Sequence, residues 1–229
     1  MKALLKLIQL EMRKNKTKLL RGALIADLIL LAFMVLVVFT EEGEFSTYAD
    51  VFDGLYVFTK AIFIIFASVL LSKLVIDEYK NNTITVLFMY PVSRKKLMAA
   101  KLLIVFGFTF ISIFLSDIIL SLLLGGIDYY FSDVIQGELS VRMMLDELPG
   151  VAADAVYSAG IALIPLFFGM RKKSVPATLV SAVLLVSVLS SGVGQFRLGN
   201  QFGVAISLSL IGVFIAYLGI KDIEVKDVA

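Results

Sequence analysis

The chain has 229 residues, of which 59% carry hydrophobic side chains, and its mean hydropathy is +0.95. A soluble domain usually contains about 45–50% apolar residues, so this composition indicates a polypeptide solvated mainly by lipid. Cysteine and histidine are both missing and the net charge is only +2, which excludes disulfides, thiol nucleophiles and histidine-based metal sites. We therefore expect no metal site, no catalytic residue and no nucleic-acid partner.

The first residues combine apolar and basic side chains at helical spacing. Leu4, Leu7, Ile8 and Met12 recur on one face, with lysine and arginine around them, a pattern typical of an amphipathic helix lying in a membrane interface. We expect residues 2–18 to form this interfacial helix. It acts either as a surface anchor alone or also as part of a docking surface for another protein.

Six apolar runs follow, each bounded by charged residues, and about 20 apolar residues are enough for a helix to cross a bilayer. The sequence therefore predicts one all-α membrane domain over residues 1–229. Small residues recur along the last run and mark close helix packing there: Gly203, Ser207, Gly212, Ala216 and Gly219. The six predicted transmembrane helices cover about residues 22–40, 55–76, 102–126, 151–169, 176–194 and 202–219.

Lysine and arginine are distributed unevenly among the segments between these spans. Seventeen of the 21 lie in residues 1–21, 77–101, 170–175 and 220–229, whereas the alternate segments contain only Arg142 and Arg197. Cytoplasmic loops of membrane proteins carry the excess of basic residues. We therefore expect a multi-pass membrane protein with both termini and the 77–101 loop in the cytoplasm.

Lys60, Asp117 and Asp154 fall inside the predicted spans or near their ends, where a charge is costly unless it is solvated or paired. Two interpretations remain open. The charges are structural or interfacial, including a pair between Lys60 and an aspartate, or they belong to a translocation path. Phe63 and Phe110 are candidates to line such a path for an amphipathic substrate.

The loop of residues 77–101 is polar at both ends and has a short amphipathic centre at residues 84–89. This centre is too short to cross a membrane and is followed by Pro91, so we expect a brief helix held under the membrane. Ser93 then lies where an N-cap would begin the next helix. Arg94 and the lysines after it are expected at the lipid phosphates.

These residues carry a family resemblance. Glu78, Thr83, the run Pro91-Val92-Ser93-Arg94 and then Lys101 at the entry to a long apolar helix look like a pattern in the first cytoplasmic loop of permease subunits of type 2 ABC exporters. A short six-span chain of this kind is similar to the bacitracin-resistance, lantibiotic-immunity and toxin-peptide export permeases of bacteria. The resemblance implies that the loop forms a coupling helix resting in a groove of a separate ATPase subunit. The docking residues it implies are Glu78, Thr83, Pro91, Ser93 and Arg94.

The chain has no G-x-x-x-x-G-K-[ST] phosphate loop. The resemblance therefore implies that the chain is not itself an enzyme and that ATP and magnesium are bound by partner chains. It implies two ABC ATPase subunits and a second permease, in a homodimer or a heterodimer. The expected function is export of an amphipathic peptide, a peptide antibiotic or a lipid-like substrate through the bacterial membrane.

Residues 127–150 combine aromatic and apolar side chains with acids, so we expect an amphipathic extracellular loop that forms a short cap or a re-entrant pair of helices. A different class of function is open alongside ATP-driven export. The alternative is an ATP-independent channel or an ion-coupled secondary transporter that uses Asp27, Asp117 and Asp154. It predicts transport without an ATPase partner and sensitivity to proton or sodium gradients.

Overall fold

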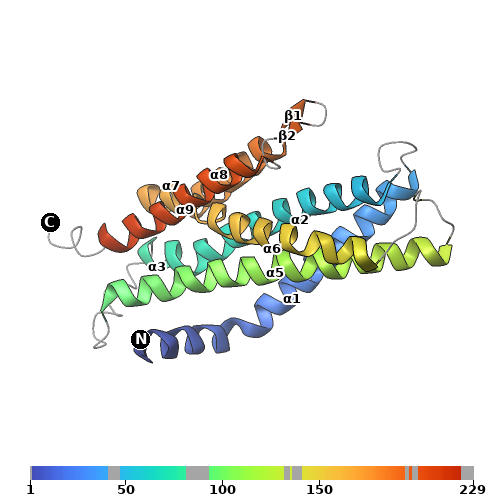
Figure 1. The fold of residues 1–229 in the computed structure, drawn as a ribbon. Helices are drawn as coiled ribbons and strands as arrows, with labels where there is room; N and C mark the ends of the chain where they lie inside the picture. The colour runs from blue at the N-terminus through green and yellow to red at the C-terminus, as the bar shows by residue number, and fades with distance from the viewer. Residues whose placement is uncertain are drawn as a thin grey trace.

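The computed structural model describes residues 2–40, 47–80, 93–131, 135, 141–193, 196–197 and 201–222. Within these ranges the chain is almost entirely helical, and its long helices lie beside one another in an elongated bundle (Figure 1). The predicted all-α membrane fold is confirmed. The proposed coupling helix at residues 84–89 lies outside the described residues, and so do residues 132–134 and 136–140 of the predicted 127–150 loop.

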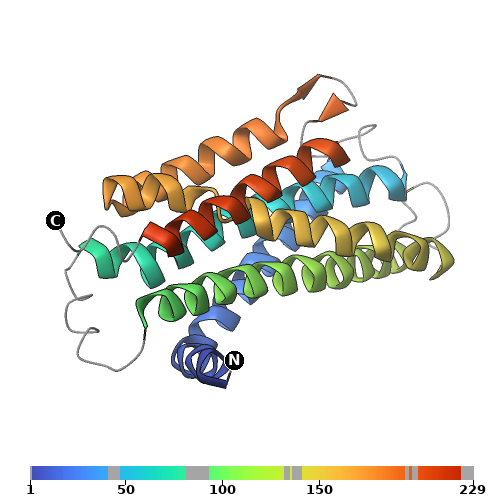
Figure 2. The same cartoon turned by 60° about the vertical axis from the view of Figure 1, so that its left-hand side comes forward.

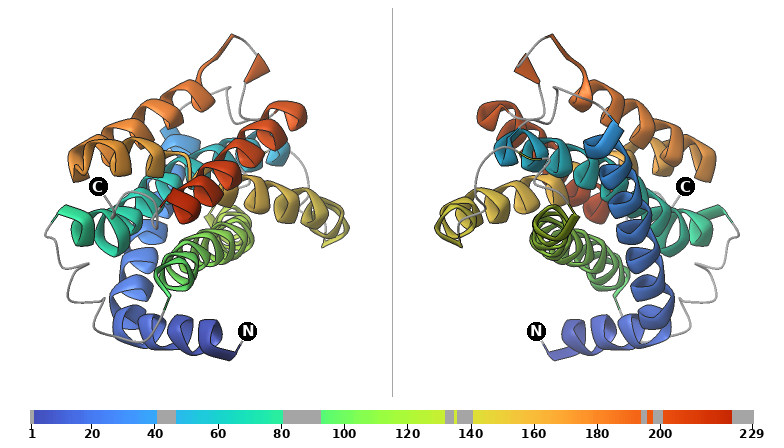
Figure 3. Two further views of the ribbon diagram at one scale, coloured as in Figure 1. Left: turned by 90° about the vertical axis from the view of Figure 1, so that its left-hand side faces the viewer. Right: turned by 90° about the vertical axis from the view of Figure 1, so that its right-hand side faces the viewer.

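Helix α1, Lys2–Thr40, joins two elements that the sequence separates. We expected an interfacial helix at 2–18 and a span at 22–40, but the backbone continues through the junction without a break. The first turns nevertheless run at a steep angle to the rest of α1, which crosses the bundle obliquely (Figures 2 and 3). The bend gives the first turns a direction distinct from the span, while their interfacial position stays a prediction.

Helix α2, Tyr48–Leu71, begins at a capping box. The Thr47 hydroxyl accepts the Asp50 backbone N–H, and the Asp50 carboxylate accepts the Thr47 N–H, each at 3.3 Å. This box satisfies two free donors at the helix start, which explains why α2 begins earlier than the predicted residue 55. The helix passes into a π-helical turn, η1 (Ser72–Ile76), and a short helix, α3 (Asp77–Lys80).

Helix α5, Arg94–Phe131, has 38 residues, many more than the predicted span 102–126. At 1.5 Å per residue it is about 57 Å long, whereas the hydrocarbon layer is about 30 Å thick. Its polar ends therefore extend beyond the bilayer. The first five residues of the predicted 127–150 loop belong to this helix, and residues from Val141 onward belong to α6, Val141–Ile161. Residues 127–131 and 141–150 continue the two neighbouring helices, and Ile135 between them is buried and donates its N–H to Asp128 at 3.1 Å. The short cap or re-entrant pair stays a prediction.

The predicted span 151–169 is broken near its centre. Helix α6 ends at Ile161 and α7 runs over Pro165–Lys172, with a turn between them. Pro165 has no N–H to continue the ladder, and Leu163 and Ile164 instead donate to the carbonyl oxygens of Gly160 and Ile161 at 3.1 and 3.0 Å. Together the two helices form one apolar stretch, Arg142–Lys172.

A turn that contains basic residues separates the fourth predicted span from the fifth. Lys173 follows α7 with φ of 45°, in the left-handed region, and α8 (Val175–Ser190) begins with Pro176 in its first turn. Helix α8 ends before the predicted residue 194, because Gly192–Val193 (β1) pairs with Phe196–Arg197 (β2) in a two-stranded ribbon. Helix α9, Phe202–Asp222, completes the described chain.

Five stretches of the described chain are long and apolar enough to cross a membrane: Leu19–Val38, Tyr48–Ile76, Lys95–Tyr130, Arg142–Lys172 and Phe202–Lys221. Helix α8 has 16 residues. At 1.5 Å per residue it is about 24 Å long, shorter than a hydrocarbon layer of about 30 Å. The predicted count of six spans therefore stays a prediction for this one helix.

Helices α6 and α9 approach each other closely at glycine residues. A Cβ atom at Gly212 would overlap the carbonyl oxygen of Gly160, and one at Gly160 would overlap the Ser209 side chain. Close backbone approach at small residues is how membrane helices gain packing energy. The sequence predicted contacts along α9, and Gly212 and Ala216 are indeed buried, whereas Gly203 and Ser207 are exposed.

We expect Gly212→Ala to lower the melting temperature of the purified chain in detergent, followed by circular dichroism. The added methyl group must displace the α6 backbone, and overpacking of this kind costs about 1–3 kcal/mol. Gly203→Ala is the matched control on the same helix, because a Cβ atom there has no neighbour within 4 Å. That variant should melt at the wild-type temperature or slightly above it, and equal melting of both variants would contradict the prediction.

Candidate functional site

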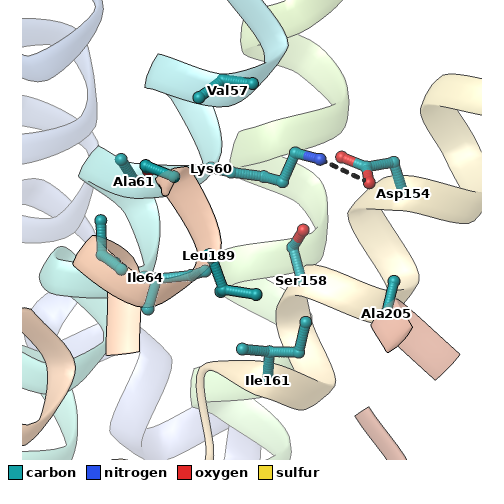
Figure 4. A pocket seen from close by; sticks show the side chains of 11 residues that line it. Val57, Lys60, Ala61, Ile64, Asp154, Ser158, Ile161, Leu189 and Ala205 are labelled. Carbon is teal, nitrogen blue, oxygen red and sulfur yellow. Dashed lines mark hydrogen bonds and ion pairs between the residues drawn. The ribbon is translucent and has the colours of Figure 1, made fainter. Parts of the chain in front are cut away.

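Two charges on different helices pair inside the bundle. The Lys60 amine on α2 lies 2.9 Å from the Asp154 Oδ1 atom on α6, and the two side chains are 14% and 26% exposed. Figure 4 shows the two side chains pointing toward one another. An unpaired charge costs about 2.5–3.5 kcal/mol at the centre of a membrane helix, so this pair makes both charges tolerable. It is the Lys60–aspartate pair that the sequence left open.

A small cavity of about 20 Å³ lies beside the pair. It is formed where α2 and α6 meet α8 and α9, and Ser190 is one of its polar lining residues. Lys60, Asp154 and Ser158 are the others (Figure 4). The second Asp154 oxygen and the Ser158 hydroxyl have no hydrogen-bond partner among the described residues. A space of this size accommodates one water molecule, and these two groups are the partners that such a water requires.

Asp117 occupies a separate environment on α5. Its residue exposure is 1%, and it lines a second, larger cavity instead of the one beside Lys60. It is still close enough to Lys60 and Asp154 to interact with them electrostatically. The structure therefore gathers the three predicted charges into one region between α2, α5 and α6 but divides them between two cavities.

A fourth membrane charge lies next to this group. Asp27 on α1 accepts a hydrogen bond of 2.7 Å from the Ser116 hydroxyl on α5. This bond ties α1 to α5 one residue before Asp117. The serine shows no sequence signal of its own, because hydroxyl residues are frequent throughout the apolar runs of this chain.

The two aromatic candidates line neither cavity. Phe63 is 1% exposed and packs with Ile113 and Ala155 in a core shared by α2, α5 and α6. Phe110 is half-buried and stacks on Phe114 with ring centroids 6.1 Å apart. In this conformation both are packing residues, and their part in a translocation path stays a prediction.

The predicted docking residues are only partly described. Glu78 in α3 forms an ion pair with Lys101 in α5, and the Lys101 side chain is almost fully buried. Ser93 lies directly before α5, and its carbonyl oxygen accepts the Leu97 N–H at 3.3 Å, as expected for a residue at a helix start. Arg94 is the first residue of that helix. Thr83 and Pro91 lie outside the described residues.

The sequence did not reveal that Lys101 pairs with Glu78, although both belong to the motif that carries the family resemblance. The pair joins the two ends of the 77–101 loop, because α3 opens the loop and the first turns of α5 close it. Ser121 was also missed. It lies four residues after Asp117, and that spacing places two side chains on the same face of a helix.

The comparisons with known proteins give this arrangement a family. Residues 7–188 match the family described as ABC-2 family transporter protein, which is most of the chain. The protein therefore belongs to the ABC-2 transporter family and is a multi-pass membrane permease component of an ABC transporter.

One relative extends the similarity to almost the full length. The chain is 40% identical over 229 residues to a Bacillus subtilis (strain 168) protein with the name "Uncharacterized protein YcbO". The alignment covers 96% of this chain and 99% of the relative. No solved structure gives a significant match.

We expect Lys60→Met to destabilise the protein strongly, because it leaves Asp154 without its partner, and removing one member of a buried pair costs about 3–5 kcal/mol. The double variant Lys60→Met with Asp154→Leu should recover most of this loss. Thermal unfolding of the single and double variants in detergent measures the coupling.

Lys73→Met is the matched control, since Lys73 is an exposed lysine on η1, and it should melt near the wild-type temperature. Additive effects of Lys60→Met and Asp154→Leu would show that the pair contributes no coupling energy.

Proposed function

We propose that this chain is the membrane-spanning permease subunit of an ATP-binding cassette exporter whose energy comes from a separate ATPase. The observation that carries the proposal is membership of the ABC-2 transporter family over residues 7–188. The lack of a phosphate-loop motif in the sequence supports a division of labour between chains. In this proposal ATP and magnesium are held by the partner.

The proposed contact with the ATPase is the 77–101 loop. Its candidate docking residues are Glu78, Thr83, Pro91, Ser93 and Arg94. The ion pair between Glu78 and Lys101 supports this role, because it fixes the start of the loop against α5. A push on the loop would then be transmitted directly to α5 and, through α3 and η1, to α2.

The proposed working unit contains two permease chains, identical or different, and two ATPase chains in a bacterial plasma membrane, with both permease termini in the cytoplasm. The substrate proposed is an amphipathic peptide, a peptide antibiotic or a lipid-like compound, and its removal would confer resistance to such a compound. The apolar character of the bundle and the few charged groups inside it support a substrate with both apolar and polar parts.

We expect the affinity-tagged full chain to co-purify with an ABC ATPase from its native membranes. Inside-out vesicles containing the complex should then accumulate a candidate peptide only when ATP is supplied. Arg94→Ala should reduce this uptake at least fivefold while leaving the amount of permease unchanged. Lys172→Ala is a matched control, because Lys172 is an exposed basic residue at another basic turn.

Uptake that needs no ATP and responds instead to a proton or sodium gradient would overturn the proposal in favour of an ion-coupled transporter. Loss of uptake in both variants to the same extent would remove the 77–101 loop from the proposed docking surface.

A further inference from the structure

The larger cavity lies between α2, α5 and α6 and has a volume of about 170 Å³. It is near the end of the bundle where α2 and α6 begin and α5 ends (Figure 1). Most of its wall is apolar and comes from all three helices: Phe52, Ile118, Leu122, Met144, Leu148 and Val151. An apolar cavity of about 150 Å³ is large enough to hold a benzene molecule, so this one has room for a small organic group.

The polar part of the wall is a pair of side chains one turn apart on α5. Asp117 and Ser121 are 1% and 3% exposed, and both line the cavity. The two carboxylate oxygens and the serine hydroxyl have no hydrogen-bond partner in good geometry among the described residues. Thr59 approaches Asp117, but its hydroxyl donates to the Leu55 carbonyl oxygen at 2.9 Å. Tyr56, which also lines the cavity, approaches Ser121.

The charge around the cavity is negative. Glu147 lines it from α6 and is exposed, and none of the described lining residues is basic. The nearest membrane lysine, Lys60, already pairs with Asp154, and Asp27 adds a further acid close by. A buried carboxylate without a partner is costly in this medium, so the site is complementary to a ligand that brings a positive charge.

The polar atoms and the apolar wall of the cavity fit an organic cation better than a metal ion. Calcium takes six to eight oxygen ligands and magnesium needs a nearly ideal octahedron, and the described residues contain no group of three or more Asp, Glu, His or Cys side chains that could hold a metal ion. A primary ammonium instead has three N–H donors, which match the three free acceptor atoms of Asp117 and Ser121. The apolar wall then covers the hydrocarbon attached to the ammonium.

We propose that the cavity between α2, α5 and α6 binds the primary ammonium group of an amphipathic ligand, with Asp117 and Ser121 as its acceptors and the apolar wall around its alkyl part. The inference rests on the proposed transport function, because it takes the bound ligand to be the transported substrate. It narrows the substrate class to amphipathic molecules that carry a primary amine.

Binding of radiolabelled n-hexylammonium to the full chain in zwitterionic lipid nanodiscs tests this inference, with empty nanodiscs subtracted for partition into lipid. We expect saturable binding that 1-hexanol, which lacks the charge, does not displace at equal concentration. Asp117→Asn keeps the shape of the side chain and removes its charge, and it should weaken binding at least tenfold because charge-assisted hydrogen bonds are lost. Asp146→Asn is the matched control, because Asp146 is an exposed acid on α6 that does not line the cavity.

A second variant keeps the test decisive if Asp117→Asn fails to fold. Leu148→Phe retains Asp117 and fills the cavity, so it should also abolish saturable binding. The proposal is overturned if hexylammonium does not saturate, if hexanol competes equally, or if Asp117→Asn and Leu148→Phe bind like the wild type. Displacement by millimolar sodium chloride would identify a metal-ion site instead and would also overturn it.

The assay contains neither an ATPase nor ATP, so its failure is distinct from failure of the proposed function. If the chain transports with its ATPase but does not bind hexylammonium, only the proposed ammonium site is refuted. If the chain binds hexylammonium through Asp117 but has no ATPase partner, the proposed ATP-driven export is refuted and the ammonium site is retained.

Discussion

Hydrocarbon offers no hydrogen bonds, so each polar group inside the bundle must find its partner within the protein. Many hydroxyl groups do so locally, as Thr59 and Thr109 donate to the carbonyl oxygens of the preceding turn at 2.9 and 2.8 Å. Two charged pairings instead join different helices, whereas the Asp117 carboxylate has no hydrogen-bond partner among the described residues. The Lys60–Asp154 pair links α2 to α6, and the Ser116–Asp27 bond links α5 to α1. The same requirement that makes these charges costly therefore holds the four helices in register.

Apolar surface gives no comparable preference for one helix arrangement over another, because lipid tails are as apolar as leucine. Shape supplies the preference instead. The contact between Gly160 and Gly212 brings α6 and α9 to backbone distance, and Gly169 leaves room for Thr178 where α7 packs on α8. Close packing of this kind makes the C-terminal helices a well-defined unit, and the paired charges attach that unit to α2.

Much of the architecture was predictable, because long apolar runs in a chain of this composition form membrane helices. The positions of the helices followed from these runs, but their bounds did not. The capping box at Thr47, the break at Pro165 and the ribbon after Ser191 depend on local hydrogen bonds that hydropathy does not report. The continuity of α1 was missed because a change from amphipathic to apolar sequence marks a change of surroundings, not the end of a helix.

The site was predictable in its residue types and less so in its geometry. A lysine within an apolar run needs a partner, so pairing of Lys60 with an aspartate could be anticipated, whereas the choice of Asp154 over Asp117 depends on how α5 and α6 are rotated. Phe63 shows the opposite case. Nothing in the sequence distinguishes a phenylalanine that lines a path from one in a core, and the structure places it in the core.

The position of the Lys60–Asp154 pair limits how a path can open between α2 and α6. Separating these helices would leave both charges without a partner, which costs each up to about 2.5–3.5 kcal/mol if it lies deep in the hydrocarbon. The small cavity beside the pair has room for one water molecule, which does not hydrate two ions. We therefore expect any separation of these helices to need more water or an incoming charged group in place of the lost partner. In the proposed function, the ammonium group of a ligand would meet this condition, because it carries a positive charge that can pair with Asp154 in place of Lys60.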